Sequence, residues 1–332
     1  MAHQDRTAHT ISPTPRIAPV VVIMGASSGI GEATAEAFAR FGARLILAAR
    51  DGSALEAVAK RCRDMGAPAL AIATDVTDPD AVKRLAGQAL AFGGRIDVWV
   101  SNVGTGAVGA FHETPIAAHE QVVRTNLIGH MNDAHAVLPL FIKQRRGVFI
   151  NMISLGGFAP APYATAYSAS KFGLRGFAEA LRGELVDYPN IHICDIYPAF
   201  VDTPGLSHGA NYAGKELSAP PPLLDPRTVA AAIVRLTRNP RPTTMLGAAT
   251  GLVRLGHFLA PELSTWLMSK FMTSYFRHAA PVARSSGNLF QPPAVPGGID
   301  GGLRSARQRN ATVAVAGLLL LGLVVRAARA RR

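Results

Sequence analysis

Short apolar runs alternate with longer amphipathic stretches from about residue 20 to residue 240 of the chain. Each run has the length and composition of a buried β-strand, and the stretches between them carry apolar residues three to four positions apart, as in a helix that buries one face. Strands that alternate with helices pair in parallel through helical crossovers. The pattern therefore predicts an α/β fold, a doubly wound and mostly parallel sheet of about seven strands flanked by helices. The strands expected from the apolar runs are Val20–Met24, Arg44–Ala49, Ala69–Ala73, Ile96–Ser101, Val148–Ile153 and Ile191–Tyr197.

The segments on either side of this pattern differ from it in composition. The first residues are polar, are interrupted by prolines and lack the apolar core of a secretory signal, so they predict a flexible leader. After about residue 240 the rhythm changes to an apolar helical region, which either packs on the domain or forms a membrane-facing or substrate-access surface. The expected segments are a leader (1–18), an α/β domain (19–247), an apolar helical extension (248–280), a Pro/Gly/Arg linker (281–310), an apolar segment (311–325) and a basic tail (326–332).

The apolar segment 311–325 contains no charged residue and has arginines on both sides. As a helix it would reach about 22 Å, whereas the hydrocarbon of a bilayer is about 30 Å thick. Three interpretations stay open: a membrane anchor helped by snorkelling arginines, a helix buried against the protein or a partner, and an unstructured apolar tail. Basic residues on both flanks predict no orientation, and we expect a cytoplasmic active site whether or not this segment attaches the protein to a membrane.

Charge and cysteine content exclude several classes of function. The formal net charge is +12, but seven arginines lie after residue 300 with no acidic residue among them, so the rest of the chain is only mildly basic. Neither zinc-finger spacing nor an aromatic and basic stacking pattern accompanies this charge, so we expect no nucleic-acid partner. Cys62 and Cys194 are far apart and match no metal-ligand spacing, which predicts two buried thiols, no disulfide and no metal site.

A glycine-rich turn follows the first expected strand directly and precedes a helical pattern. Its sequence is Gly25-Ala26-Ser27-Ser28-Gly29-Ile30-Gly31. Glycines let the backbone turn sharply and approach a ligand closely, and the free N–H groups and dipole of the following helix favour a negative charge. The turn therefore predicts a site for the pyrophosphate of a dinucleotide, although its spacing differs from the commoner G-x-G-x-x-G fingerprint.

The end of the second expected strand bears on which dinucleotide binds. Enzymes that use NAD usually carry a carboxylate there, which accepts hydrogen bonds from the ribose. This chain has Ala49 and then Arg50, which leaves room for a 2′-phosphate and supplies donors for it, so we expect NADP(H) to be favoured over NAD(H). Asp51 argues in the other direction. Asp75, after the third strand, either hydrogen-bonds an adenine amino group or caps the next helix.

Tyr167 and Lys171 lie four positions apart in a helical pattern, so their side chains project from one face of the helix. A neighbouring ammonium stabilises phenolate, which makes proton exchange by the tyrosine feasible near neutral pH. Ser154 follows a buried strand, where its hydroxyl could polarise a carbonyl oxygen or orient an alcohol. Asn126 lies in a long helix, where its amide either holds a water that links the lysine to solvent or is an ordinary polar residue.

With the glycine turn and Tyr-x-x-x-Lys together, the chain resembles the short-chain dehydrogenase/reductase family over about residues 18 to 240. The resemblance implies a single Rossmann-type domain, the catalytic set Asn126, Ser154, Tyr167 and Lys171, and binding of the nicotinamide ribose by Lys171. It also implies that Thr203 contacts the cofactor amide. The residues expected to bind the cofactor are Gly25, Ser27, Ser28, Gly29, Ile30, Gly31, Arg50, Asp75, Val76, Asn102, Tyr167, Lys171 and Thr203.

The chain departs from the family pattern at three places, none of which carries a catalytic group. Met24 stands where the glycine turn usually begins with threonine, Ser101-Asn102-Val103-Gly104 replaces the usual Asn-Asn-Ala-Gly, and Tyr197-Pro198-Ala199 replaces Pro-Gly. These differences affect local packing. The implied reaction is reversible hydride transfer between NADPH and a carbonyl carbon, with Tyr167 giving the proton to oxygen.

The expected function is therefore an NADP-dependent carbonyl reductase or alcohol dehydrogenase that acts on a fairly hydrophobic small molecule. Two alternatives stay open: an NAD-dependent alcohol dehydrogenase of the same family, and a catalytically silent, membrane-tethered nucleotide-binding scaffold. The family resemblance also implies a homodimer or homotetramer built on the two long helices before the fifth and sixth strands.

Overall fold

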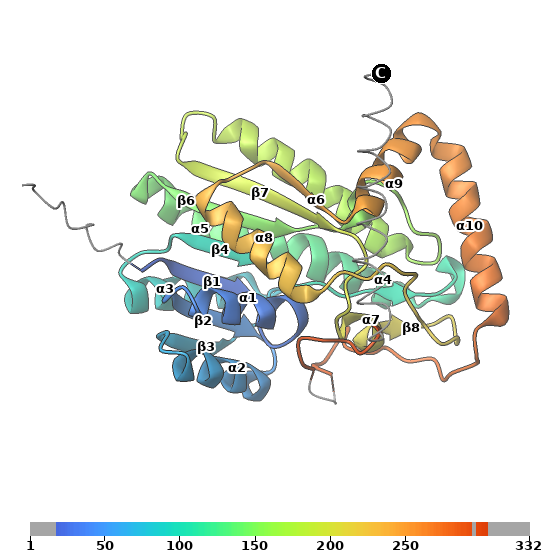
Figure 1. The fold of residues 1–332 in the computed structure, drawn as a ribbon, viewed down its shortest axis with the longest axis horizontal. Helices are drawn as coiled ribbons and strands as arrows, with labels where there is room; N and C mark the ends of the chain where they lie inside the picture. The colour runs from blue at the N-terminus through green and yellow to red at the C-terminus, as the bar shows by residue number, and fades with distance from the viewer. Residues whose placement is uncertain (1–17, 294–296, 305–332) are drawn as a thin grey trace, which may run out of the picture.

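A seven-stranded sheet in which all strands pair in parallel forms the centre of the computed structural model, which describes residues 18–293 and 297–304 (Figure 1). The strand order is β3-β2-β1-β4-β6-β7-β9. The strands are β1 (Val20–Met24), β2 (Arg44–Ala49), β3 (Ala69–Ala73), β4 (Val98–Ser101), β6 (Gly147–Met152), β7 (Ile191–Pro198) and β9 (Thr243–Leu246).

Six of these strands coincide with the apolar runs of the sequence. The first three have the predicted bounds, and β4, β6 and β7 differ by one or two residues at their ends. The seventh strand, β9, was not among the runs because it begins with two threonines and pairs only with β7 at the edge of the sheet. The predicted α/β fold with a parallel sheet is confirmed.

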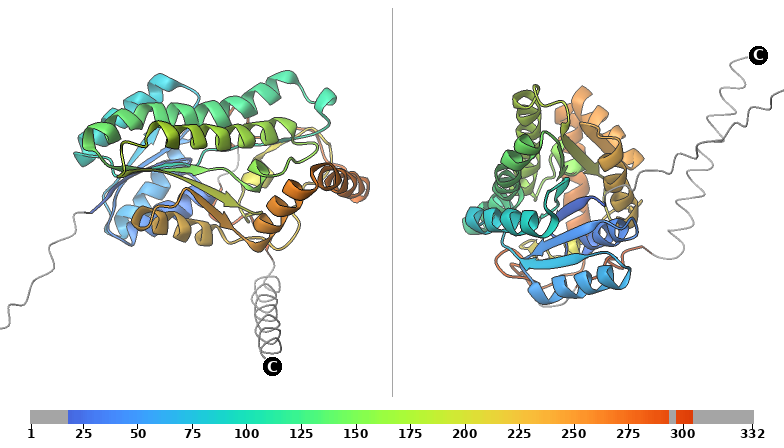
Figure 2. Two further views of the ribbon diagram at one scale, coloured as in Figure 1. Left: turned by 90° about the horizontal axis from the view of Figure 1, so that it is seen from above. Right: turned by 90° about the vertical axis from the view of Figure 1, so that its left-hand side faces the viewer.

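Helices cover both faces of the sheet, as the view from above shows (Figure 2). One hydrophobic cluster joins the sheet to α1, α2 and α8, and a second joins it to α3, α5 and α6. These helices are α1 (Gly29–Ala39), α2 (Gly52–Asp64), α3 (Pro79–Gly93), α5 (Gly129–Gln144), α6 (Thr165–Glu184) and α8 (Pro226–Arg238).

Strand β1 contributes to both clusters because successive side chains of a strand point to opposite faces. Val21 and Ile23 pack in the cluster that contains Phe38 of α1, whereas Val22 packs in the cluster that contains Leu85 of α3. All five side chains are almost completely buried. Burial of each aliphatic or aromatic side chain contributes about 1.5–3 kcal/mol, so the two clusters hold the central strands rigidly in place.

The strand order reverses at β1, which lies between β2 and β4. In open α/β sheets a ligand crevice forms outside the carboxyl ends of the strands at such a reversal. The glycine-rich turn follows β1, and Asn102 follows β4. The topology therefore brings these two loops to the same edge of the sheet.

The segments around this edge include short elements. A second, two-stranded sheet joins β5 to β8. The short elements are β5 (Ala107–Val108), the 3₁₀ turn Phe111–Glu113, α4 (Ile116–Val123), a π-helical turn at Arg124–Ile128, the 3₁₀ turn Leu155–Gly157, α7 (Gly205–His208) and β8 (Ala210–Asn211).

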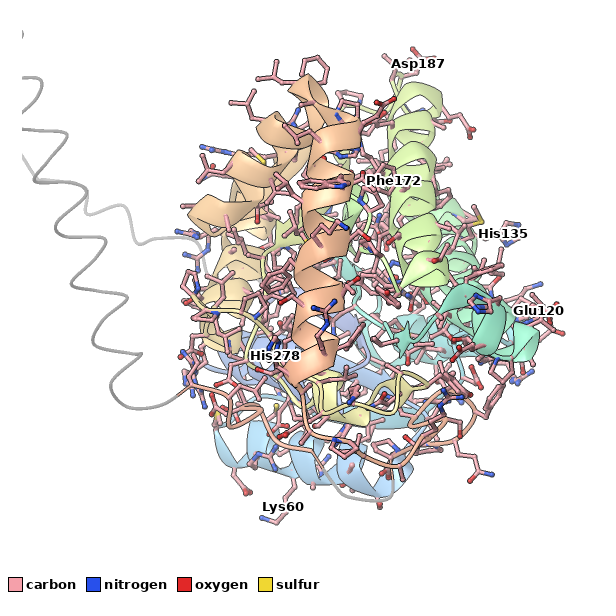
Figure 3. All side chains as sticks on the ribbon, turned by 90° about the vertical axis from the view of Figure 1, so that its right-hand side faces the viewer. Lys60, Glu120, His135, Phe172, Asp187 and His278 are labelled. Atoms are coloured by element: carbon pink, nitrogen blue, oxygen red, sulfur yellow. The ribbon has the colours of Figure 1, made fainter. Side chains whose placement is uncertain are left out.

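The expected apolar helical extension forms α9 (Ala248–Leu259) and α10 (Pro261–His278). The two helices stand at one side of the domain, and α10 crosses the front of Figure 3 with His278 at its end. Their large apolar side chains are mostly exposed, up to 80% for Phe258. In residues 18–293 and 297–304, no helix is both long and apolar enough to cross a membrane. The predicted leader (apart from residue 18), the apolar segment 311–325 and the basic tail lie outside the described residues.

Candidate active site

The glycine-rich turn is a tight connection between β1 and α1 that requires glycine. Gly25 has a φ of 69°, in the left-handed region of the backbone that residues with a side chain rarely adopt. A Cβ on Gly31 would lie 1.9 Å from the carbonyl oxygen of Gly25, so no side chain fits there. Ser28 is the N-cap residue of α1; its backbone is extended, and its side chain makes no capping hydrogen bond. Ile30 packs against the core. The turn thus presents backbone N–H groups at the positive end of an eleven-residue helix.

Arg50 and Asp51, at the end of β2, have different environments. The Asp51 carboxylate accepts hydrogen bonds from the backbone N–H groups of Ala54 and Ser53, both at 3.0 Å, and so caps α2. The bond from Ala54 is the main cause that lowers the pKa of Asp51. Burial lowers the pKa of the Arg50 guanidinium, and the charge of Asp75 opposes this shift. Asp51 is therefore engaged by its own helix, whereas the guanidinium of Arg50 donates hydrogen bonds to the backbone carbonyls of Asn288 and Leu289.

Asp75 and Val76 follow β3 in a turn rather than a helix cap. Asp75 accepts hydrogen bonds from the backbone N–H and hydroxyl of Thr77 at 2.9 and 2.8 Å, and the cap of α3 is Asp78. Val76 is buried against the first residue of α5, Gly129. A Cβ on Gly129 would lie 2.7 Å from the Val76 side chain. The structure thus excludes the capping interpretation of Asp75 and leaves its charge near Arg50.

Two further predicted residues border the glycine turn. The side-chain amide of Asn102 donates a 3.4 Å hydrogen bond to the carbonyl of Gly25, which links the end of β4 to the turn. Thr203 follows β7, and a Cβ added to Gly29 would lie 3.2 Å from the Cβ of Thr203. Both residues therefore lie at the carboxyl edge of the sheet with the turn, as the sequence predicts for a common site.

Ser154 and Tyr167 face each other across Gly156. A Cβ on Gly156 would lie 3.1 Å from Cε1 of Tyr167 and 3.7 Å from the hydroxyl of Ser154. Ser154 has a φ of 147°, a strained value for a residue with a side chain, and its hydroxyl accepts a 3.1 Å hydrogen bond from the N–H of Gly156. Burial raises the pKa of Tyr167, and the Ser154 side chain opposes this shift. The two hydroxyl groups therefore form one site between β6 and α6.

Lys171 lies one turn along α6 from Tyr167 and is only 3% exposed. Its Nζ donates a 3.0 Å hydrogen bond to the carbonyl of Met152 and lies 5.7 Å from the centre of the Tyr167 ring. Burial lowers the pKa of Lys171 to about 7. A charge placed this close to the phenol favours the phenolate and so facilitates proton transfer.

Asn126 lies in the π-helical turn between α4 and α5 and is completely buried. Its amide oxygen accepts a hydrogen bond from the N–H of Thr105 at 2.8 Å, and its amide nitrogen donates to the carbonyl of Thr105 at 2.9 Å and to Ser170 at 3.1 Å. A Cβ on Gly104 would lie 3.8 Å from both the Asn126 oxygen and the Lys171 Nζ. Asn126 thus fixes the loop after β4, and Gly104 of this loop lies near both the Asn126 amide and the Lys171 ammonium.

His130 was not identified from the sequence; it is a buried histidine close enough to Lys171 for the lysine charge to lower its pKa. His130 makes contacts of 2.6 Å from Nδ1 to the Asn151 side-chain oxygen and 2.8 Å from Nε2 to the carbonyl of Val103. Burial, and then the charge of Lys171, lowers the pKa of His130 to about 4, so the imidazole is neutral at pH 7. Its position four residues after Asn126 on the same helical pattern was the available signal.

The comparison with known proteins identifies the relatives of this chain. Residues 19–210 match the family described as short chain dehydrogenase. Mouse "Dehydrogenase/reductase SDR family member 7" is 35% identical over 188 residues, which are 55% of this chain and 56% of the mouse protein. The chain therefore matches just over half the length of that relative.

Two solved structures are also similar. A short chain dehydrogenase/reductase from Burkholderia phymatum in complex with NAD has a TM-score of 0.67 and 24% identity over 74% of this chain and 95% of its own, which indicates the fold. An alcohol dehydrogenase from Thermococcus sibiricus complexed with 5-hydroxy-NADP has a TM-score of 0.62 and 26% identity over 69% of this chain and 96% of its own. These two similar structures were thus solved with NAD in one case and with a derivative of NADP in the other.

Proposed function

Because the chain belongs to the short-chain dehydrogenase family of NAD(P)-dependent oxidoreductases, we propose that it transfers hydride between NADP(H) and a carbonyl or secondary alcohol of a hydrophobic small molecule. The bound nicotinamide supplies or accepts the hydride. The observation that carries the proposal is the convergence of Ser154, Tyr167 and Lys171, with the lysine Nζ 5.7 Å from the centre of the tyrosine ring.

The residues at the carboxyl edge of the sheet fit a dinucleotide. Only glycine is compatible with the closed turn at Gly31, and such a turn lets a pyrophosphate approach the N–H groups of α1. We assign the pyrophosphate to residues 25–31, the adenosine end to Arg50, Asp75 and Val76, and the nicotinamide end to Asn102 and Thr203.

The phenol of Tyr167 gives a proton to the substrate oxygen during reduction and takes it back during oxidation. Ser154 donates a hydrogen bond to that oxygen, which stabilises the negative charge that develops on it. Lys171 lowers the cost of forming phenolate and also binds the nicotinamide ribose. Asn126 fixes the loop after β4 through its hydrogen bonds to Thr105, and it also donates to Ser170, the residue before the lysine.

The preference for NADP(H) rests on Arg50. A guanidinium offers several N–H donors in a planar fork that matches a phosphate. Of the two nearby carboxylates, Asp51 caps α2 and Asp75 accepts hydrogen bonds from Thr77. A ribose 2′-hydroxyl would lack the carboxylate acceptor that NAD-dependent relatives of this fold usually provide.

The proposal of a hydrophobic substrate rests on the helices beside the catalytic residues. The Tyr163 hydroxyl contacts Thr273 of α10 at 3.4 Å, and its ring packs edge-on against Phe276 at 5.0 Å between centroids, which places α10 beside the loop that leads to Tyr167. A cavity of about 500 Å³ between α6 and α9 is lined by four large apolar or aromatic side chains and by the basic residues Arg175, Arg254 and His257. Its lining includes Phe158, Phe172, Leu255 and Phe258.

The deciding experiment is titration of the full chain with NADPH and, separately, with NADH, followed by nicotinamide fluorescence and then by reduction of apolar aldehydes and ketones. Binding of NADPH at least tenfold tighter than NADH, with carbonyl reduction, is expected. Tighter binding of NADH would favour the NAD-dependent alternative. Binding without turnover of any carbonyl or alcohol would favour the silent scaffold.

A further inference from the structure

The segment after α10 returns to the carboxyl edge of the sheet and contacts the groups assigned above to the cofactor. We call residues 284–293 and 297–304 the C-terminal strap; in Figure 1 it passes below β8 and α7. At the end of β2, Arg50 donates hydrogen bonds to the carbonyls of Asn288 at 2.6 Å and Leu289 at 3.2 Å. At the glycine turn, the N–H of Gly29 donates a 2.9 Å hydrogen bond to the carbonyl of Gly298. The strap carbonyls thus occupy donors at both the phosphate and the adenosine ends of the crevice.

The strap also packs tightly against the catalytic end of the crevice. Leu289 is completely buried in a small cluster that includes Ala107 and Ala210 and against which Tyr167 packs. The neighbouring Asn288 accepts a 2.7 Å hydrogen bond from the hydroxyl of Thr105, the residue whose backbone is held by Asn126. The strap therefore lies between Arg50 and the catalytic group and does not simply cover their outer surface.

Two glycines allow the strap backbone to press against residues of the proposed cofactor site. A Cβ on Gly297 would lie 2.9 Å from the Cβ of Ser28, and a Cβ on Gly301 would lie 2.4 Å from the carbonyl oxygen of Thr203. These distances are shorter than any carbon side chain tolerates without movement of the backbone. At these points there is no room for a ligand between the strap and the site.

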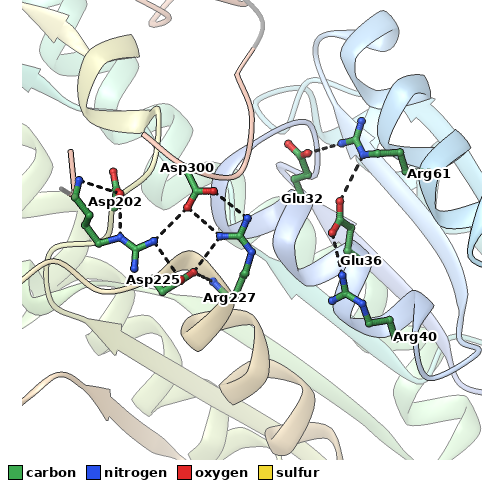
Figure 4. A network of polar contacts seen from close by, with 9 residues as sticks. Glu32, Glu36, Arg40, Arg61, Asp202, Asp225, Arg227 and Asp300 are labelled. Carbon is green, nitrogen blue, oxygen red and sulfur yellow. Dashed lines mark hydrogen bonds and ion pairs between the residues drawn. The ribbon is translucent and has the colours of Figure 1, made fainter. Parts of the chain in front are cut away.

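An ion-pair cluster fastens the end of the strap to the body of the domain (Figure 4). Arg304 pairs with Asp202 at 2.9 Å and with Asp225 at 3.1 Å, and Asp300 forms two 2.9 Å hydrogen bonds with Arg227. The side chain of Arg304 is only 10% exposed. The hydrogen bond from Arg227 is the main cause that lowers the pKa of Asp300, so the carboxylate is charged throughout the physiological range. We call this cluster the clasp.

From these contacts we propose that the C-terminal strap is an intramolecular competitor of the nicotinamide cofactor: it occupies the dinucleotide crevice while its clasp is closed, and cofactor binding requires its displacement. This inference rests on the proposed function, since it takes the N–H of Gly29 and the guanidinium of Arg50 as cofactor ligands. The single N–H of Gly29 can serve the strap carbonyl or a phosphate oxygen, but not both. The N–H groups of Arg50 that bond Asn288 and Leu289 are likewise not free for a phosphate while the strap is in place.

The competition has a thermodynamic consequence. The observed association constant for the cofactor equals the intrinsic association constant multiplied by the fraction of molecules in which the strap is open. Any change that weakens the clasp without touching the crevice therefore tightens cofactor binding. Conversely, a saturating cofactor must open the strap, because linkage is reciprocal.

The first test is hydrogen exchange of the full chain, measured by mass spectrometry with and without saturating NADPH. We expect amides of residues 284–293 and 297–304 to exchange faster in the presence of NADPH, while amides of the glycine turn become more protected. Equal or slower exchange in the strap would overturn the proposal, because it would mean that the strap stays closed over the bound cofactor.

The second test compares Asp300→Asn with the matched variant Asp64→Asn, which removes an exposed ion pair with Lys60 on α2. Loss of the clasp pairs of Asp300 should tighten NADPH binding about two- to fivefold, the range that one or two surface ion pairs provide, and Asp64→Asn should leave the affinity unchanged. An unchanged affinity in Asp300→Asn refutes strap competition. If neither the unmodified chain nor either variant binds NADPH or NADH, the proposed function is refuted as well.

Discussion

Lys171 donates a 3.0 Å hydrogen bond from its ammonium to the backbone carbonyl of Met152, the last residue of β6. This bond ties α6 to the strand that ends just before Ser154, so the lysine, the tyrosine and the serine are held by one contact between a helix and a strand. A buried ammonium with a single carbonyl partner is costly to charge, and burial lowers its pKa to about 7.

Lys171→Met should change how stability depends on pH. The pKa of Lys171 is about 7 in the folded protein and near 10.5 in the unfolded chain, so between these values the unfolded chain binds more protons and the stability of the fold rises with pH. The variant lacks this contribution. We expect the rise of the denaturation midpoint between about pH 7 and pH 10 to be smaller in Lys171→Met than in the unmodified protein; the same slope in both would contradict the depressed pKa.

Tyr167→Phe should lower turnover by about 10²–10⁴-fold, because it removes the group that we propose as the proton donor and acceptor. Cofactor affinity should stay within about twofold, since the ring and its packing are kept. Steady-state rates and a fluorescence titration measure the two quantities. Tyr188→Phe, which alters a tyrosine beyond the far end of α6, is the control and should retain full turnover. Normal turnover in Tyr167→Phe would remove this phenol from the mechanism.

Arg50→Ala should shift cofactor preference. Loss of charged hydrogen bonds to a 2′-phosphate costs about 1.5–3 kcal/mol, which corresponds to weaker NADPH binding by about 10- to 100-fold. NADH should bind equally well or better, because the variant also releases the strap carbonyls of Asn288 and Leu289. Arg44→Ala, at the other end of β2, is the matched control. An equal loss for both cofactors would count against a 2′-phosphate contact.

Gly31→Ala should disrupt the glycine turn, because its Cβ would lie 1.9 Å from the carbonyl of Gly25. Overpacking of this kind costs about 1–3 kcal/mol, and we expect a lower melting temperature together with weak cofactor binding. Gly87→Ala is the control: Gly87 lies on α3 with open space where a Cβ would be, so alanine should stabilise the helix by about 0.5–1 kcal/mol. Thermal melts of both variants decide the matter, and a Gly31→Ala protein as stable as the unmodified chain would refute the steric argument.

Some parts of the candidate site could be predicted because their signals are local. The glycine turn and the spacing of Tyr167 and Lys171 follow from the geometry of one strand end and one helix turn. The role of Asp75 could not be settled in this way, since a turn with Thr77 and a helix cap require nearly the same residues. His130 was missed because its spacing from Asn126 does not by itself indicate a buried site, and its partners Asn151 and Val103 lie in β6 and after β4.

Hydrophobic periodicity and short motifs depend on neighbours within a few positions, so they were enough to predict the class of fold, six of the seven strands of the main sheet, and the residues that mark the family. Three features became visible only in the folded chain: the engagement of Asp51 by its own helix, the position of Gly104 near both Asn126 and Lys171, and the contacts of the C-terminal strap with Arg50 and Gly29. Arg50 and its strap partner Asn288, for example, are more than 230 positions apart in the chain. Such contacts depend on how the whole chain packs, which no local pattern of residues specifies.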